Sequence, residues 1–93
     1  MSLEGLHILV VDGEPYRQLL DTFLSTNGAQ VTSCDDGESA YQKTVLESFN
    51  CIVSDVHMPT MGGVELLSKI RNTLKCNTTL ILISGNLNFT PSN

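Results

Sequence analysis

Four short apolar runs recur along this chain, and each of the first three is followed by a segment with helical spacing. The runs cover residues 7–11, 29–34, 51–54 and 79–84. The first, His7-Ile8-Leu9-Val10-Val11, is apolar almost throughout, which is typical of a strand buried on both faces. This alternation predicts an α/β fold with a parallel sheet, right-handed crossovers and helices on both faces of the sheet.

The segments between the runs have the boundaries of helices. Pro15 suits the first turn of a helix, and Asn27-Gly28 suits a C-terminal stop. Asp35-Asp36-Gly37-Glu38 predicts a turn followed by a helix start, and Lys69 and Arg71 lie near the end of the third helix, where cations interact favourably with the dipole. Each predicted helix has an apolar face: Leu19, Leu20, Phe23 and Leu24 in the first; Ala40, Tyr41, Val45 and Leu46 in the second; Val64, Leu66, Leu67 and Ile70 in the third.

Composition limits the size and class of the protein. The 93 residues suit a single domain over residues 1–93, with 85–93 as a polar tail, and 41% apolar residues indicate a folded chain. The net charge of −5, with only five Lys and Arg, argues against a nucleic-acid surface. No apolar stretch approaches the roughly 20 residues of a membrane helix. Cys34, Cys51 and Cys76 have no metal-binding spacing, and their odd number indicates a reducing, cytoplasmic setting.

Polar side chains stand where three of the predicted strands end. Asp12 follows the first strand, with Glu14 just beyond it; Asp55 follows the third, and Ser84 ends the fourth. The carboxyl ends of parallel strands meet at one edge of the sheet, so we expect these groups to converge. A shared Mg²⁺ relieves the repulsion between two carboxylates and leaves positions for phosphate oxygens. Asp55 could then attack a phosphoryl group, with Ser84 bonding one of its oxygens.

Four ordered segments resemble the receiver domains of response regulators. They are Ile8 to Pro15, Asp36 to Ala40, Ser54 to Gly63 and Leu82 to Gly85. The third is the most specific, because Asp55 to Gly63 has the form D-x-x-M-P-x-M-x-G. The resemblance extends from about residue 7 to residue 84.

The resemblance implies a flavodoxin-like, doubly wound, three-layer fold with the strand order 2-1-3-4. It implies that Asp55 is the phosphoacceptor, that Asp12 belongs to the acidic pocket, and that the backbone carbonyl of His57 is a metal ligand. Ser84 would be the switch hydroxyl, and the Met58-Pro59 turn and Gly63 would shape the loop that presents Asp55. The implied cofactor is Mg²⁺, and the implied partner is a sensor histidine kinase or a phosphotransfer protein.

One departure from the family pattern concerns the metal. The family usually has a second acid directly after the position of Asp12, and this chain has Gly13 there. The loss of a carboxylate ligand should weaken Mg²⁺ binding. Glu14 is the candidate to compensate because its side chain is long, although the adjacent Pro15 restricts the backbone.

A second departure is the absence of a recognisable fifth β-α unit, which carries a lysine and an aromatic switch residue in the family. Without that unit, residues 79–84 would form an exposed apolar edge strand. The chain could be a fragment of a longer one, could borrow the unit by domain swapping, or could pair edge to edge as a homodimer. We favour the fragment, and the intact mass of the natural protein would test it.

Two alternative functions remain open. Gly13 and the missing fifth unit motivate a degenerate receiver that acts as an interaction module without phosphorylation. The order of Asp12, Glu14 and a later serine also approaches the haloacid dehalogenase phosphatases, but the Met58-Pro59 segment has no place in that family. The favoured hypothesis is therefore a signalling phosphoacceptor and not an enzyme with an external substrate.

Overall fold

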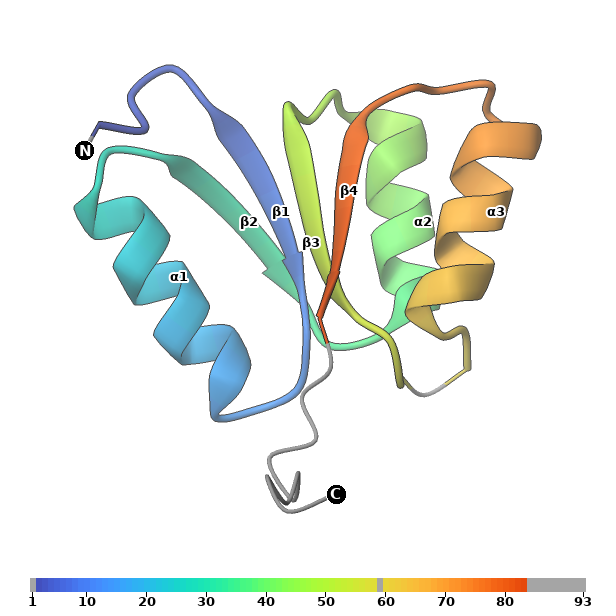
Figure 1. Cartoon of the computed structure of the whole chain (residues 1–93), viewed down its shortest axis with the longest axis horizontal. Coiled ribbons are helices and arrows are strands. Elements are labelled where there is room, and N and C mark those ends of the chain that lie inside the picture. The colour runs from blue at the N-terminus through green and yellow to red at the C-terminus, as the bar shows by residue number, and fades with distance from the viewer. Residues whose placement is uncertain (1, 59, 84–93) are drawn as a thin grey trace, which may run out of the picture.

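The computed structural model of the chain describes residues 2–58 and 60–83. Strands and helices alternate strictly over this part of the chain (Figure 1). The elements are β1 (His7–Val11), α1 (Tyr16–Thr26), β2 (Gln30–Cys34), α2 (Gly37–Leu46), β3 (Cys51–Asp55), α3 (Gly63–Asn72) and β4 (Thr79–Ile83).

The strands form one parallel sheet in the order β2-β1-β3-β4. Helix α1 covers one face of the sheet, and α2 and α3 cover the other, which gives three layers (Figure 1). The predicted fold class and strand order are therefore confirmed. The strand boundaries differ slightly, since β2 begins at Gln30 and the buried Ala29 precedes it.

The core lies on both faces of the sheet because β1 is buried on both of its sides. Leu9 and Val11 pack with Ile52 beneath α2 and α3, in a cluster that includes Leu66 and Ile70. Ile8 and Val10 point the other way and pack against Ala29, with Leu20 and Leu24 of α1 over them. The prediction that β1 is buried on both faces is confirmed.

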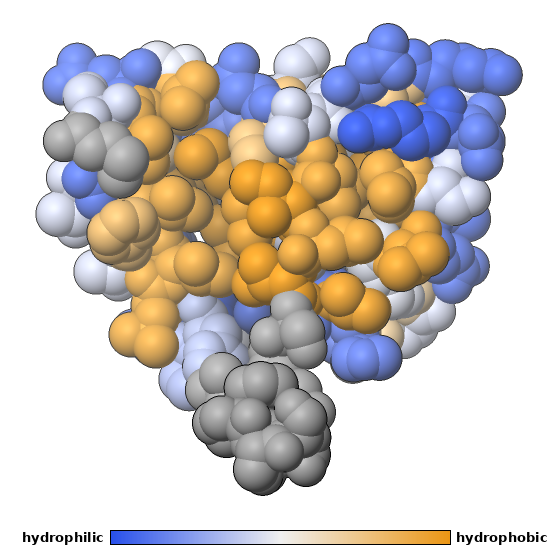
Figure 2. All heavy atoms as spheres, viewed as in Figure 1, coloured by the Kyte–Doolittle hydropathy of each residue, from blue (hydrophilic) through white to orange (hydrophobic). Residues whose placement is uncertain are grey.

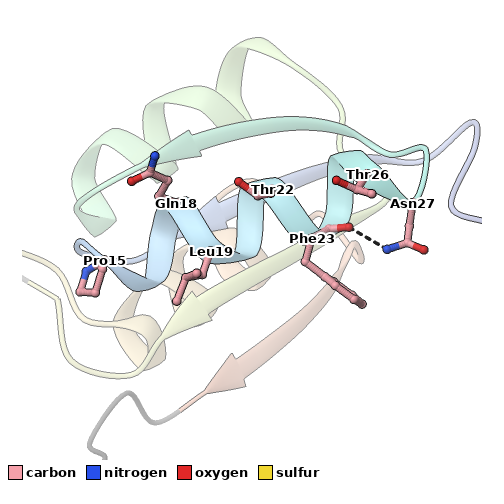
Figure 3. Close-up of a pocket in the computed structure, with 7 residues that line it drawn as sticks. All are labelled: Pro15, Gln18, Leu19, Thr22, Phe23, Thr26 and Asn27. Atoms are coloured by element: carbon pink, nitrogen blue, oxygen red, sulfur yellow. Dashed lines mark hydrogen bonds between the residues drawn. The ribbon is translucent and has the colours of Figure 1, made fainter.

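The predicted apolar face of α1 is wrong in part. Leu20 and Leu24 contact the core, but Leu19 is 62% exposed and Phe23 is 54% exposed. Helix α1 packs on β2 and β1, so only one half of its apolar stripe meets the sheet. Figure 3 shows Leu19 and Phe23 projecting from the same side of α1, on the wall of a shallow cavity of about 540 Å³.

The faces predicted for α2 and α3 are also wrong at one or more positions each. In α2, Ala40 is buried, whereas Val45 and Leu46 are exposed. In α3, Leu66 and Ile70 are buried, whereas Val64 is exposed. Apolar spacing shows that a helix is amphipathic, but the neighbouring elements decide how wide a stripe they cover.

Strand β4 lies at an edge of the sheet, and no strand within residues 2–58 and 60–83 pairs with its outer side. Ile81, in the middle of β4, is 47% exposed. Figure 2 shows apolar side chains gathered over the centre of this view, where β4 lies in Figure 1. The predicted apolar edge is thus present in the described part of the chain.

Candidate functional site

The first residue of the site, Asp12, follows β1 directly and is 2% exposed. Its backbone N–H donates to the carbonyl of Cys34, which fixes the chain just beyond the strand. Its Oδ1 accepts a hydrogen bond of 2.7 Å from the N–H of Gly13. Its Oδ2 is buried and has no hydrogen-bond partner among the described residues. A buried carboxylate oxygen in this state is costly unless a cation or a proton satisfies it.

Burial raises the pKa of Asp12 above its ordinary value, and Asp55 raises it further, first through the hydrogen bond that a proton shared by the two carboxyl groups would make and then through its negative charge. The hydrogen bond from Gly13 acts in the opposite direction and lowers the pKa. Burial and the second carboxylate together disfavour the charged form of Asp12. A bound cation would reverse both effects, because it neutralises the carboxylates and replaces the missing partner.

Asp55 is the last residue of β3, and the register of the sheet brings it beside Asp12. Val11 pairs with Ser54, so the next residue along each strand, Asp12 and Asp55, reaches the same edge of the sheet. The Oδ1 of Asp55 accepts a hydrogen bond of 3.2 Å from the N–H of His57. The convergence of the two carboxylates follows directly from parallel strands with this register.

The loop after Asp55 is closed by a glycine. The N–H of Gly63 donates to the carbonyl of Val56 at 2.9 Å. A Cβ atom added at Gly63 would lie 2.5 Å from the carbonyl oxygen of Asp55 and 2.7 Å from the Cδ2 of Leu82. This close approach supports the prediction that Gly63 shapes the loop. Pro59, the other predicted loop residue, lies outside the described residues.

Asp12 and Asp55 line one open cavity of about 440 Å³ at the carboxyl ends of the strands. Glu14 and Asp35 add two further carboxylates to its wall, and His57 is exposed at its rim. The other lining residues are Gly13, Tyr16, Arg17 and Met58. Within the described ranges, no three His, Cys, Asp or Glu side chains cluster closely enough to hold a metal ion, so protein ligands here would be few.

Glu14 forms an ion pair that the sequence analysis missed. The Nη2 of Arg17 donates to the Oε1 of Glu14 at 2.5 Å. The spacing of three residues at the start of a helix is a signal that could have revealed this pair. Glu14, the predicted substitute for the acid missing at position 13, is thus engaged by a guanidinium at the rim of the cavity.

Three further residues singled out from the sequence are not among the described lining of the cavity. Ser84, the predicted switch hydroxyl, lies outside the described residues. Lys69 lies 5.2 Å from the ring centre of Tyr41, and Arg71 donates to the carbonyl of Cys76 at 2.8 Å, so both cations have structural contacts.

In the part of the chain that the structure describes, no helix is both long and apolar enough to cross a bilayer.

The sequence model described as the response regulator receiver domain matches residues 8–90, which is most of the chain. The chain belongs to the response regulator receiver domain family. This receiver is 38% identical over 72 residues to the transcriptional regulatory protein FixJ of Bradyrhizobium diazoefficiens. That match covers 76% of this chain and 35% of FixJ, so the chain spans about a third of that relative.

Solved receiver structures agree with this fold. The receiver domain of the Francisella response regulator 1452 is 30% identical and superposes with a TM-score of 0.80, over 95% of this chain and 72% of that one. The response regulator protein TrrA of Thermotoga maritima, solved in complex with Mg(2+)-BeF, is 31% identical with a TM-score of 0.79, over 89% of this receiver and 72% of TrrA. Both support the assignment of this chain to a signalling family.

Proposed function

We propose that this receiver accepts a phosphoryl group on Asp55 from a sensor histidine kinase or a phosphotransfer protein. The observation that carries the proposal is the pair formed by Asp55 and the buried Asp12, whose Oδ2 has no partner in the described chain. Two adjacent carboxylates with few other protein ligands suit Mg²⁺, which commonly binds one or two carboxylates together with water and phosphate oxygens. The Mg²⁺-containing structure of TrrA adds support from a relative.

Asp12, Asp55 and the backbone carbonyl of His57 are the proposed ligands. When bound, Mg²⁺ would neutralise the carboxylates and draw phosphoryl oxygens into the cavity. An Oδ atom of Asp55 would form a bond to phosphorus as the bond from phosphorus to the donor breaks, with the electron pair remaining on the donor. Asp12 would stay ionised beside the metal and orient it.

Partner switching follows from the charge that phosphorylation adds. An aspartyl phosphate adds negative charge and strong acceptor oxygens at the end of β3. We expect Ser84, the residue after the last one of β4, to bond those oxygens and to bias a partner-binding face between two conformations. The residue pair Asp55 and Ile83 is in register across β3 and β4, which couples the two strand ends.

Phosphorylation can be tested with Mg²⁺ and acetyl phosphate, by intact mass. We expect the parent chain to gain the mass of one phosphoryl group, and Asp55→Asn to gain none. Because Tyr16 lines the cavity and the chain has no Trp, tyrosine fluorescence offers a second readout with Mg²⁺ and beryllofluoride. A parent chain that behaves like Asp55→Asn in both assays would contradict the proposal.

A second candidate is a receiver that binds partners without phosphorylation, which Gly13 motivates. Calorimetric titration with Mg²⁺ separates the two candidates, since an interaction module of this kind would show no binding. We expect no turnover of p-nitrophenyl phosphate in either case. We also propose a cytoplasmic location, because the three free cysteines suit a reducing compartment.

A further inference from the structure

Arg17 is the one Lys or Arg side chain that lines the carboxylate cavity in the described part of the chain. The cavity wall also carries Asp12, Glu14, Asp35 and Asp55, so this cation faces a strong excess of negative charge. Its position is set by the first turn of α1, where its backbone N–H donates to the carbonyl of Gly13 at 2.9 Å.

The guanidinium of Arg17 contacts two carboxylates at the rim of the cavity. Its Nη2 donates to the Oε1 of Glu14 at 2.5 Å, and its Nη1 lies 3.9 Å from the Oδ2 of Asp35. Only 25% of the Arg17 side chain is exposed, whereas Glu14 and Asp35 are exposed at 53% and 68%. The shorter contact is a charge-assisted hydrogen bond, and the longer one is an electrostatic contact.

The position that lacks an acid has room for one. A Cβ atom added at Gly13 would meet no other atom within 4 Å, and the backbone there does not adopt a positive φ. Steric crowding therefore does not explain the missing carboxylate. With Gly13 in place, Glu14 is the nearest side chain in sequence that could supply a third carboxylate beside Asp12 and Asp55.

We propose that Arg17 is a positioning residue that holds the Glu14 carboxylate away from the metal position, so that Mg²⁺ and Arg17 compete for Glu14. This inference rests on the proposed Mg²⁺ site. The buried Oδ2 of Asp12, which lies beside the Asp55 carboxyl and has no partner there unless the two share a proton, marks the cation position. Mg²⁺ demands close, near-octahedral oxygen contacts, so Glu14 must leave the guanidinium in order to bind it. An ion pair whose carboxylate is half exposed to solvent is weak, so the competition tunes affinity without abolishing binding.

The experiment measures the Kd for Mg²⁺ by calorimetry and by tyrosine fluorescence. Arg17→Gln should bind Mg²⁺ roughly two- to fivefold more tightly, the upper part of the range expected for release of one exposed ion pair. Arg17→Lys keeps the positive charge and should stay within about twofold of the parent, although Lys lacks the planar fork of Arg.

Two double variants of equal net charge identify which carboxylate becomes free to bind Mg²⁺ when Arg17 is replaced. Arg17→Gln combined with Asp35→Asn should keep most of the increase in Mg²⁺ affinity, whereas Arg17→Gln combined with Glu14→Gln should lose that increase. Equal gains in the two double variants would overturn the proposal, because they would show that Arg17 acts only through its charge. The melting temperatures of all variants, measured without Mg²⁺, would report any purely structural effect.

Gly13→Asp separates failure of this inference from failure of the proposed site. It restores an acid at an open position and should tighten Mg²⁺ binding whether or not Arg17 holds Glu14. If Gly13→Asp binds more tightly and Arg17→Gln binds like the parent, the competition is overturned and the metal site stands. If none of the variants binds Mg²⁺, the proposed site is overturned and the competition with it.

Discussion

At the scale of single residues, the site places an acid where its charge is disfavoured. Asp12 is almost fully buried beside a second carboxylate, and one of its oxygens has no hydrogen-bond partner among the described residues. Such an arrangement lowers stability in the absence of a cation and creates affinity for one. Under the proposed function, Asp12 exchanges stability for metal binding, as active-site groups commonly do.

Asp12→Asn should stabilise the metal-free protein at pH 7 by about 1 kcal/mol, the usual size of a stabilising substitution. The pKa of Asp12 is raised in the folded state, so the folded state holds this proton more tightly than the unfolded state. The stability of the parent should therefore fall as the pH rises above the ordinary pKa of 3.8 and the buried carboxylate ionises. Urea denaturation of both proteins between pH 3 and pH 7, at a set of pH values of about one unit spacing, measures the difference.

The advantage of Asp12→Asn should be smallest at the acidic end of the series and largest at neutral pH. Millimolar Mg²⁺ should stabilise the parent and leave Asp12→Asn unchanged, since a ligand stabilises only a state that binds it. An advantage that is constant over the pH range would show that Asp12 is not the titrating group.

At the scale of elements, the start of α3 approaches the end of β3 so closely that only glycine fits. The Cβ position of Gly63 is occupied by the carbonyl of Asp55 on one side and by Leu82 on the other. The same loop carries His57, whose N–H bonds the carboxylate of Asp55. The packing of α3 on the sheet and the presentation of Asp55, the proposed phosphoacceptor, are therefore parts of one arrangement.

Gly63→Ala should destabilise the protein by roughly 1–3 kcal/mol, the range for an extra methyl group forced into a packed site. In an open helix this change would instead be favourable, because alanine is the better helix former. Gly13→Ala is the matched control, since its Cβ would lie in open space and should change stability little. Urea midpoints of the two variants give the comparison, and equal midpoints would contradict the close approach at Gly63.

At the scale of the whole molecule, the two faces of the sheet are covered unequally. Helices α2 and α3 lie side by side on one face, whereas α1 alone covers the other in the described part of the chain (Figure 1). Leu19, Phe23 and Ile81 are consequently among the exposed large apolar residues. Strand β4 contains no charged residue that would discourage pairing at its outer edge.

We expect the 93-residue chain to self-associate in a concentration-dependent manner through the β4 edge. Ile81→Lys should weaken this association about tenfold or more, because a charge in the middle of an edge strand opposes pairing. Val64→Lys adds the same charge at an exposed position of α3 and should leave association unchanged. Sedimentation equilibrium of the three proteins measures the association constants. An equal weakening of association in both variants would point to net charge, not the β4 edge, as the cause.

The sequence by itself determined the order of strands and helices, the burial of β1 on both faces, and the edge of the sheet at which the candidate site lies. These features follow from short-range patterns. A run of apolar residues such as Ile8 to Val11 is stable only when both faces of the strand are buried, and parallel strands place Asp12 and Asp55 at one edge of the sheet. The tertiary structure decided which half of each apolar helix face is covered, as the exposure of Leu19 and Phe23 shows. It also decided that Glu14 pairs with Arg17 and that Gly63 meets the carbonyl of Asp55. Spacing along a chain describes one element at a time, whereas these contacts depend on the distance between elements, which only packing sets.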